Sequence, residues 1–121
     1  MQNPLFPDII EGATAAQYVA KKWGIKTRLV PFQTFAVLTT VQLALKGNPK
    51  RFQLLVANLG SGNVFVGWDA GLTTSNGLLI SASGGSLGLV IDEDAELVTY
   101  ALYAIAPAAG SQLTMWEVES L

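Results

Sequence analysis

The chain of 121 residues contains no cysteine and no histidine. Without cysteine it has no disulfide, no thiolate nucleophile and no cysteine metal ligand. Without histidine it lacks the commonest general base at neutral pH, the Ser-His and Cys-His pairs, and the usual zinc ligands other than carboxylates. The two absences predict a protein that is not an enzyme and that holds no cofactor and no metal.

Charged residues are also scarce. They make up 13% of the chain, against about 25% in an average soluble domain, while half of the residues are hydrophobic. Such an excess of apolar surface indicates a subunit that buries part of itself against partners. A tightly packed small β protein is the alternative interpretation.

Long hydrophobic runs are absent as well. No apolar run reaches the roughly 18 residues of a membrane span, and the start of the chain lacks the charged and apolar regions of a signal peptide. We therefore expect a soluble protein that is made in the cytoplasm and has no membrane partner.

Positive charge is missing from the second half of the chain. All seven Lys and Arg residues lie at or before Arg51, and seven of the nine acidic residues follow it. The segment up to Arg51 carries +7 and −2, a net charge of +5, and residues 52–121 carry −7, which together give −2. Opposite fields attract and orient partners, so identical subunits could dock head to body, or the basic head could grip an acidic surface of another protein.

The first part of this head, residues 1–30, is predicted to be an extended arm with one short helix. Pro4 and Pro7 restrict the backbone to extended conformations. The spacing of Thr14 and Gln17 is typical of a capping box, and Gly24 is typical of a helix end. About ten residues of helix are too short to be stable alone, so this helix must pack on something.

The head also supplies the predicted partner-binding residues, which are Tyr18, Lys21, Lys22, Trp23, Lys26 and Arg28. Cations beside aromatic rings are also typical of nucleic-acid contacts. The isoelectric point near 4.9 argues against that alternative, because an acidic body repels a polyanion. We therefore expect an acidic protein surface as the partner, and no nucleic acid.

Residues 31–121 are predicted to form an antiparallel β-sandwich. Short apolar runs alternate with glycine-containing turns such as Asn76-Gly77, a pattern typical of all-β domains. The expected strands are 35–45, 52–58, 64–68, 78–81, 87–91, 97–105 and 112–118. The predicted fold class is thus all-β, a jelly-roll-like sandwich of about seven strands preceded by the arm and its short helix.

Two sets of residues are candidates for ligand chemistry. Asp92, Asp94 and Glu96 could offer oxygen ligands to calcium, but they lack the glycine-centred spacing of an EF-hand, and a solvated turn between two strands is the favoured interpretation. Trp68 and Trp116 could bind glycans if they are exposed, whereas buried they would be core or interface anchors.

The succession of strands and turns from Arg51 to Glu117 resembles a small β-sandwich module of tailed-bacteriophage virion proteins. The similarity is carried by residues 51–67 (RFQLLVANLGSGNVFVG), 76–77 (NG), 102–105 (LYAI) and 110–113 (GSQL). As turn or strand-end residues it marks Asn58, Gly60, Gly62, Gly67, Asn76, Gly77 and Gly110, and as a central strand Leu102, Tyr103 and Ile105.

The resemblance implies a structural protein on the virion, at the capsid surface. The expected function is that of a capsid decoration (cement) protein that binds and stabilises the capsid, with the major capsid protein or another virion protein as partner. It also implies a homo-oligomer, expected to be a trimer. The alternative is a receptor- or glycan-binding module of a head fibre or tail.

Overall fold

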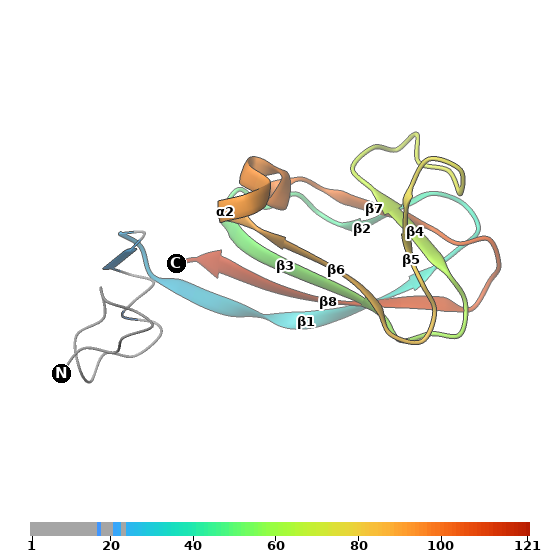
Figure 1. The fold of residues 1–121 in the computed structure, drawn as a ribbon, viewed down its shortest axis with the longest axis horizontal. Helices are drawn as coiled ribbons and strands as arrows, with labels where there is room; N and C mark the ends of the chain where they lie inside the picture. Colours follow the sequence, from blue (N-terminus) through green and yellow to red (C-terminus); the bar gives the residue numbers. More distant parts are fainter. Residues whose placement is uncertain (1–16, 18–20, 23) are drawn as a thin grey trace.

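The computed structural model describes residues 17, 21, 22 and 24–121, and this part of the chain contains eight strands (Figure 1). They are β1 (Thr27–Val37), β2 (Gln42–Leu45), β3 (Arg51–Asn58), β4 (Val64–Gly67), β5 (Leu78–Ile80), β6 (Gly85–Val90), β7 (Leu102–Ile105) and β8 (Ser111–Ser120). Between β6 and β7 lie a short helix, α2 (Ile91–Asp94), and a 3-10 helix, η1 (Ala95–Thr99).

The strands form two antiparallel four-stranded sheets. Sheet A has the strand order β1-β8-β3-β6, and sheet B has the order β2-β7-β4-β5. Eight strands shared in this order between two packed sheets are a jelly roll. The predicted fold class, an all-β antiparallel sandwich of jelly-roll type, is confirmed.

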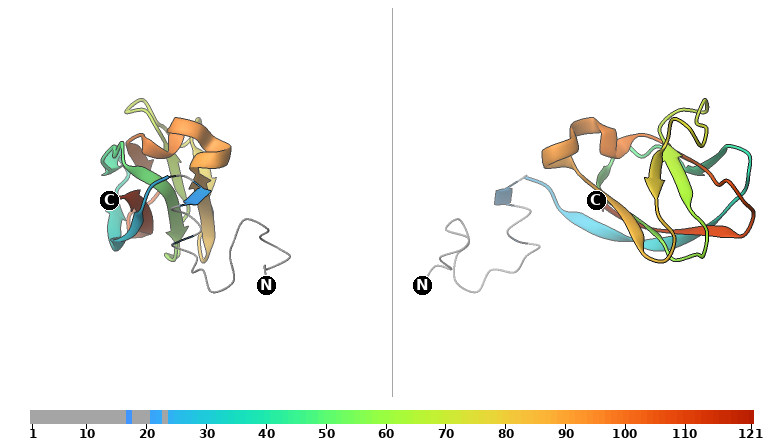
Figure 2. Two further views of the ribbon diagram at one scale, coloured as in Figure 1. Left: turned by 90° about the vertical axis from the view of Figure 1, so that its left-hand side faces the viewer. Right: turned by 45° about the vertical axis from the view of Figure 1, so that its right-hand side comes forward.

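The core lies between the sheets because alternate residues of each strand point inward. In β8, Leu113 and Met115 are buried, and β3 contributes Leu54 and Val56. The strands of sheet A are longer than those of sheet B, and α2 and η1 lie beside the part of sheet A that sheet B leaves uncovered (Figures 1 and 2). Val98 of η1 is fully buried there.

The first predicted strand, 35–45, is in fact two strands. β1 ends at Val37 and β2 begins at Gln42, with an exposed turn between them. The chain changes sheets at this turn, which is fixed by a hydrogen bond from the Ala106 N–H to the Leu38 carbonyl. Periodicity alone did not reveal this corner, and the strand count is therefore eight instead of seven.

The boundary predicted between residues 30 and 31 lies inside β1. Thr27 to Val30 already pair with β8, and the register shifts between Val30 and Gln33. Pro31 is tolerated because β1 is an edge strand and the irregularity absorbs the missing N–H. Arm residues 27–30 thus belong to the sandwich.

Two further expectations need correction in the segment after β6. The predicted turn at Asp92–Glu96 is the helical pair α2 and η1, and the strand predicted over 97–105 begins only at Leu102. Asp94 accepts a hydrogen bond from the Val90 N–H at 2.8 Å, which closes the first helical turn in place of an extended connection.

The helix predicted near residues 14–24 falls mostly outside the described residues. Gln17, Lys21 and Lys22 have helical backbone conformations, and Gly24 has a left-handed φ of 72°, which suits a helix end. Among the described residues, no helix has the length and apolar character needed to cross a membrane.

Candidate functional site

The predicted partner-binding residues that the structure describes are all exposed. Lys21, Lys22, Lys26 and Arg28 expose their side chains to solvent, whereas Tyr18 and Trp23 lie outside the described residues. Arg28 is already engaged within the chain, because its guanidinium donates to the Glu119 carboxylate at 2.6 to 2.8 Å across the β1–β8 pair. It still leaves 63% of its side chain exposed.

Glu119 is the centre of a group of polar side chains that joins β1, β8 and the β2–β3 connection. Its second oxygen accepts a hydrogen bond from the Asn48 side-chain amide at 2.8 Å. The hydrogen bonds from Asn48 and Arg28 hold the pKa of this carboxyl below its ordinary value, since both stabilise the charged form.

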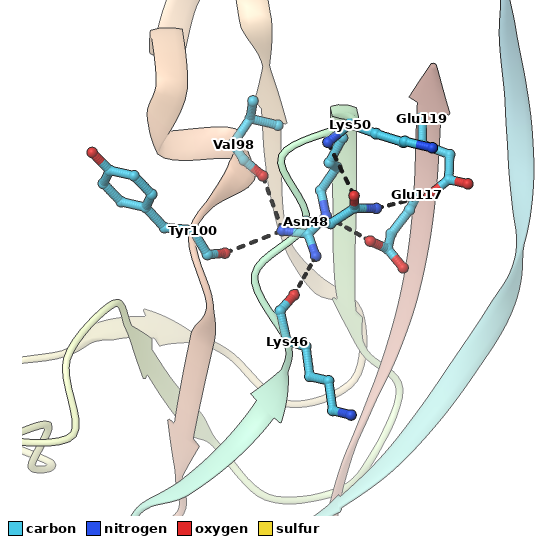
Figure 3. Close-up of polar contacts among 8 residues, drawn as sticks. Lys46, Asn48, Lys50, Val98, Tyr100, Glu117 and Glu119 are labelled. Carbon is cyan, nitrogen blue, oxygen red and sulfur yellow. Dashed lines mark hydrogen bonds and ion pairs between the residues drawn. The ribbon is translucent and has the colours of Figure 1, made fainter. Parts of the chain in front are cut away.

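A second ion pair, between Arg51 and Glu117, is buried beside the first. Arg51 Nε donates to Glu117 at 2.5 Å, and the other guanidinium nitrogens donate to the carbonyls of Lys46, Val98 and Tyr100 at 2.7 to 3.1 Å (Figure 3). One side chain thus holds β3 to β8, to the β2–β3 connection and to η1. Nothing in the sequence alone indicates this role, because Arg51 is the last of the seven basic residues in the basic head.

These polar residues line one wall of a cleft of about 590 Å³ between β1 and β2. The lining also includes apolar side chains of β1 and β2, among them Val30, Leu43 and Leu45. In the described part of the chain, every buried side-chain nitrogen and oxygen has a hydrogen-bond partner. The buried hydrogen-bonding groups of these charged residues therefore all have partners within the protein, and their structural role explains their presence.

The acidic residues proposed as calcium ligands are not brought together. Asp92 is exposed on α2 and Glu96 on η1, and the Asp94 carboxylate accepts a hydrogen bond from the Val90 N–H. Within residues 24–121 and the few described before them, no group of three or more acidic side chains is arranged to hold a metal ion.

The two candidate glycan-binding tryptophans lie on different sheets and cannot form one platform. Trp68 follows β4 and packs against the hydrophobic core. Trp116 points outward from β8 with 39% of its surface exposed, and its ring lies 5.0 Å from the ring of Phe32. Of the two tryptophans, it is therefore Trp116 that offers an aromatic surface on a sheet face.

Trp116 belongs to a row of residues that crosses the outer face of sheet A. In the strand register, Trp116 stands opposite Leu55, and Leu55 stands opposite Gly88. Phe32 lies on the other side of Trp116, in the irregular part of β1. We call Phe32, Trp116, Leu55 and Gly88 the central row; Phe32 and Leu55 are 55% and 44% exposed.

No described residue on the outer face of either sheet is charged. The four charged residues within strands are Arg28, Arg51, Glu117 and Glu119, and all four are joined in the two ion pairs. On sheet B, the outward residues include the pair Leu43 and Tyr103 and the pair Phe65 and Leu79, with Leu79 55% exposed. Both broad faces of the sandwich are therefore apolar or neutral.

Exposed charge gathers instead at one end of the sandwich, which we call the charged end. It comprises the start of β1, the β2–β3 connection and the α2–η1 segment, and it carries Lys26, Lys46, Lys50, Asp92, Glu93 and Glu96. At the opposite end, the connections 38–41, 59–63, 81–84 and 106–110 contain no charged residue. Arg28, which is paired with Glu119 near the start of β1, and Asp69, in the β4–β5 connection, are the remaining exposed charged side chains of the described body.

The sequence matches no protein-family model and no curated protein. Among solved structures, it is similar to dTDP-4-dehydrorhamnose 3,5-epimerase of Bacillus anthracis, at 17% identity and a TM-score of 0.46 over 86% of this chain and 60% of the enzyme. It is also similar to the dTDP-6-deoxy-D-glucose-3,5-epimerase of Legionella pneumophila, at 15% identity and a TM-score of 0.48 over 93% and 59%. A subunit of the disulfide-linked pili of Bacillus endospore appendages matches at 15% identity and a TM-score of 0.48, over 80% and 88%.

These comparisons correct one expectation from the sequence. The prediction that the chain is not an enzyme is contradicted by the epimerases among its structural neighbours, and we withdraw it. The chain spans about 60% of the length of these enzymes, and similarity at this level describes the arrangement of strands without assigning an activity. The resemblance to bacteriophage virion modules stays a prediction.

Proposed function

We propose that this protein is a decoration protein of a tailed-bacteriophage capsid, which binds the capsid surface through the charged end and the basic residues that precede β1. The observation that carries the proposal is the confinement of exposed charge to that end, while the two sheet faces and the opposite end are nearly free of charge.

This distribution suits a subunit that docks with its end and meets neighbours with its faces. Charged groups steer and orient an encounter, so the charged end defines which way the sandwich approaches a surface. Neutral apolar faces bury without the desolvation cost of unpaired charges. On a lattice, many modest contacts of this kind act together and stabilise the assembled particle.

The proposal is tested by co-sedimentation of the purified full chain with capsids of the phage that encodes it. The variant combining Lys21→Gln, Lys22→Gln and Lys26→Gln removes three positive charges. Its control combines Thr39→Glu, Thr40→Glu and Ser61→Glu, which adds three negative charges at the uncharged end. Both variants shift the net charge by −3, and we expect only the lysine variant to lose binding.

A truncated chain gives an independent check. Deletion of residues 1–24 leaves β1 whole, whereas deletion through residue 30 would remove Thr27 to Val30, which pair with β8. We expect the chain with the shorter deletion to show the circular dichroism spectrum of a folded protein and to lose its affinity for capsids. A truncated chain that still decorates them at full occupancy would refute the role of the head.

A second candidate function is glycan binding by the face around Trp116. The exposed pair of Phe32 and Trp116 favours it, because aromatic faces pack on the apolar faces of sugars. Calorimetry across a broad glycan panel tests this alternative, with Trp116→Ala expected to abolish binding and Trp68→Ala, whose ring packs on the core, as the comparison. Absence of binding across the panel removes it.

A further inference from the structure

The central row on sheet A changes from bulky to empty across the sheet. The rings of Phe32 and Trp116 project from the half of the face nearer β1, whereas Gly88 lies in β6 and has no side chain. A Cβ atom at Gly88 would meet no other atom within 4 Å, and the φ of this glycine is not left-handed. Neither the packing nor the backbone of the chain itself therefore requires a glycine at this position.

We propose that a second copy of this chain covers the outer face of sheet A, related by a two-fold axis that lies between the two faces, parallel to the strands and midway between β8 and β3. This rotation exchanges β1 with β6 and β8 with β3. Phe32 of each copy then lies over Gly88 of the other, and Trp116 lies over Leu55. A ring thus fills each recess.

The rows beside the central row obey the same operation. The row on one side consists of Leu29, Val118, Gln53 and Val90, and the row on the other side consists of Thr34, Thr114, Ala57 and Ser86. The two-fold places Leu29 over Val90 and Thr34 over Ser86. An apolar side chain therefore meets an apolar one, and a hydroxyl-bearing side chain meets another. No charged group enters the interface.

The face is large enough to hold two copies together. Four strands about 4.8 Å apart and roughly eight residues long, at about 3.3 Å per residue, give a face of roughly 500 Å². Two such faces bury about 1,000 Å² when they pack, which reaches the size that specific interfaces require. Sheets that pack face to face in this way keep their strands nearly aligned, as within a sandwich.

The direction of the axis fits the charge distribution. Rotation about the strand direction keeps both charged ends on the same side of the dimer, so two heads could engage one surface. The ends can lie side by side because the exposed Lys26, Lys46 and Lys50 of each copy balance the exposed Asp92, Glu93 and Glu96. The inference rests on the proposed function and deepens it by naming the partner of this face. A monomeric chain that still bound capsids would refute the dimer and leave the proposed function standing.

Light scattering of the full chain after size exclusion tests the proposal, at low and at high salt. We expect twice the 12.8 kDa mass of one chain in both conditions, because the interface contains no charge. A monomer, or the trimer that the resemblance to virion modules implies, would overturn the two-fold pairing, and so would a dimer that dissociates in high salt.

Substitution at Gly88 tests the pairing itself. Gly88→Phe fills the recess, and we expect the dissociation constant to rise at least tenfold while the circular dichroism spectrum and melting temperature stay those of a folded chain. Gly71→Phe is the matched control and should leave the dimer intact, because Gly71 is exposed in the β4–β5 connection and a Cβ there would make only ordinary contacts with Asp69.

A compensating exchange then identifies the opposing residues. Phe32→Ala alone should weaken the dimer, and Phe32→Ala combined with Gly88→Phe moves the bulky ring from β1 to β6 and the recess from β6 to β1. The combination should restore dimerisation, since the two positions face each other across the axis. A combined variant that remains monomeric, or a Gly88→Phe chain that remains a dimer, would overturn the proposal.

Discussion

Removal of the Arg51 guanidinium is expected to destabilise the fold strongly. Arg51 is 1% exposed and Glu117 7% exposed, so Arg51→Met leaves a buried carboxylate without its counterion. It also deprives three main-chain carbonyls of a donor. Loss of one partner from a buried ion pair typically costs about 3 to 5 kcal/mol, a large part of the roughly 5 to 15 kcal/mol that stabilises a domain of this kind.

The pair of Arg28 and Glu119 provides the comparison, because it joins the same strand β8 to its other neighbour. Arg28 is largely exposed, so Arg28→Met is expected to cost no more than about 1 kcal/mol. The double variant Arg51→Met with Glu117→Leu removes both buried charges and should recover at least half of the loss caused by Arg51→Met. The unpaired carbonyls prevent full recovery.

Urea unfolding followed by tryptophan fluorescence measures these differences, with the m-value as a check that the transition stays two-state. An Arg51→Met chain that loses less than about 1 kcal/mol would refute the view that the buried network holds the end of the sandwich together. Equal stability of the single and double variants would show instead that the carbonyls dominate, and that the charge on Glu117 is well solvated.

Three further predictions concern single residues. Gly85→Ala should destabilise the fold by more than about 2 kcal/mol in thermal unfolding, because its Cβ would lie 2.4 Å from the Ser81 carbonyl oxygen. Asn58→Ala should cost about 2 to 3 kcal/mol in urea unfolding, since this buried amide donates to two main-chain carbonyls and accepts from one N–H. Because the pKa of Glu119 is lowered in the folded state, its ionisation contributes stability that is complete above the ordinary value of 4.5 and is lost as the pH falls through the folded-state pKa. Glu119→Gln should therefore make the free energy of unfolding less dependent on pH in the acid range.

Much of the fold could be predicted from the sequence because its strands have period-two patterns and its turns contain glycine or asparagine. β3 and β4 begin within one residue of their predicted start, and both lie between recognisable turns. The corner at residues 38–41 was missed because the apolar alternation continues through it. The helical pair after Val90 was missed because the strand-like run from Leu97 to Ile105 hid the 3-10 turn.

The central row could be predicted only in part. Trp116 was noted as a ring that would matter if exposed, and its alternation with the buried Met115 and Glu117 is a strand signal. Nothing local links Trp116 to Phe32, Leu55 or Gly88, because the four residues come from four strands. Their alignment depends on the registers of β1, β3 and β6, which the sequence alone does not specify.

The charge split along the chain has a different meaning in three dimensions. In sequence, the basic half and the acidic half suggest two opposite poles that attract another molecule. In the fold, β8 returns between β1 and β3, so Glu119 and Glu117 meet Arg28 and Arg51 of the same chain. The loop that carries Lys46 and Lys50 lies at the same end as the acidic α2–η1 segment. Part of the attraction between the halves is thus used within the subunit, where it joins β1 and β3 to β8 and so supports the strand registers that align the central row. The exposed lysines are concentrated at the charged end and in the residues before β1.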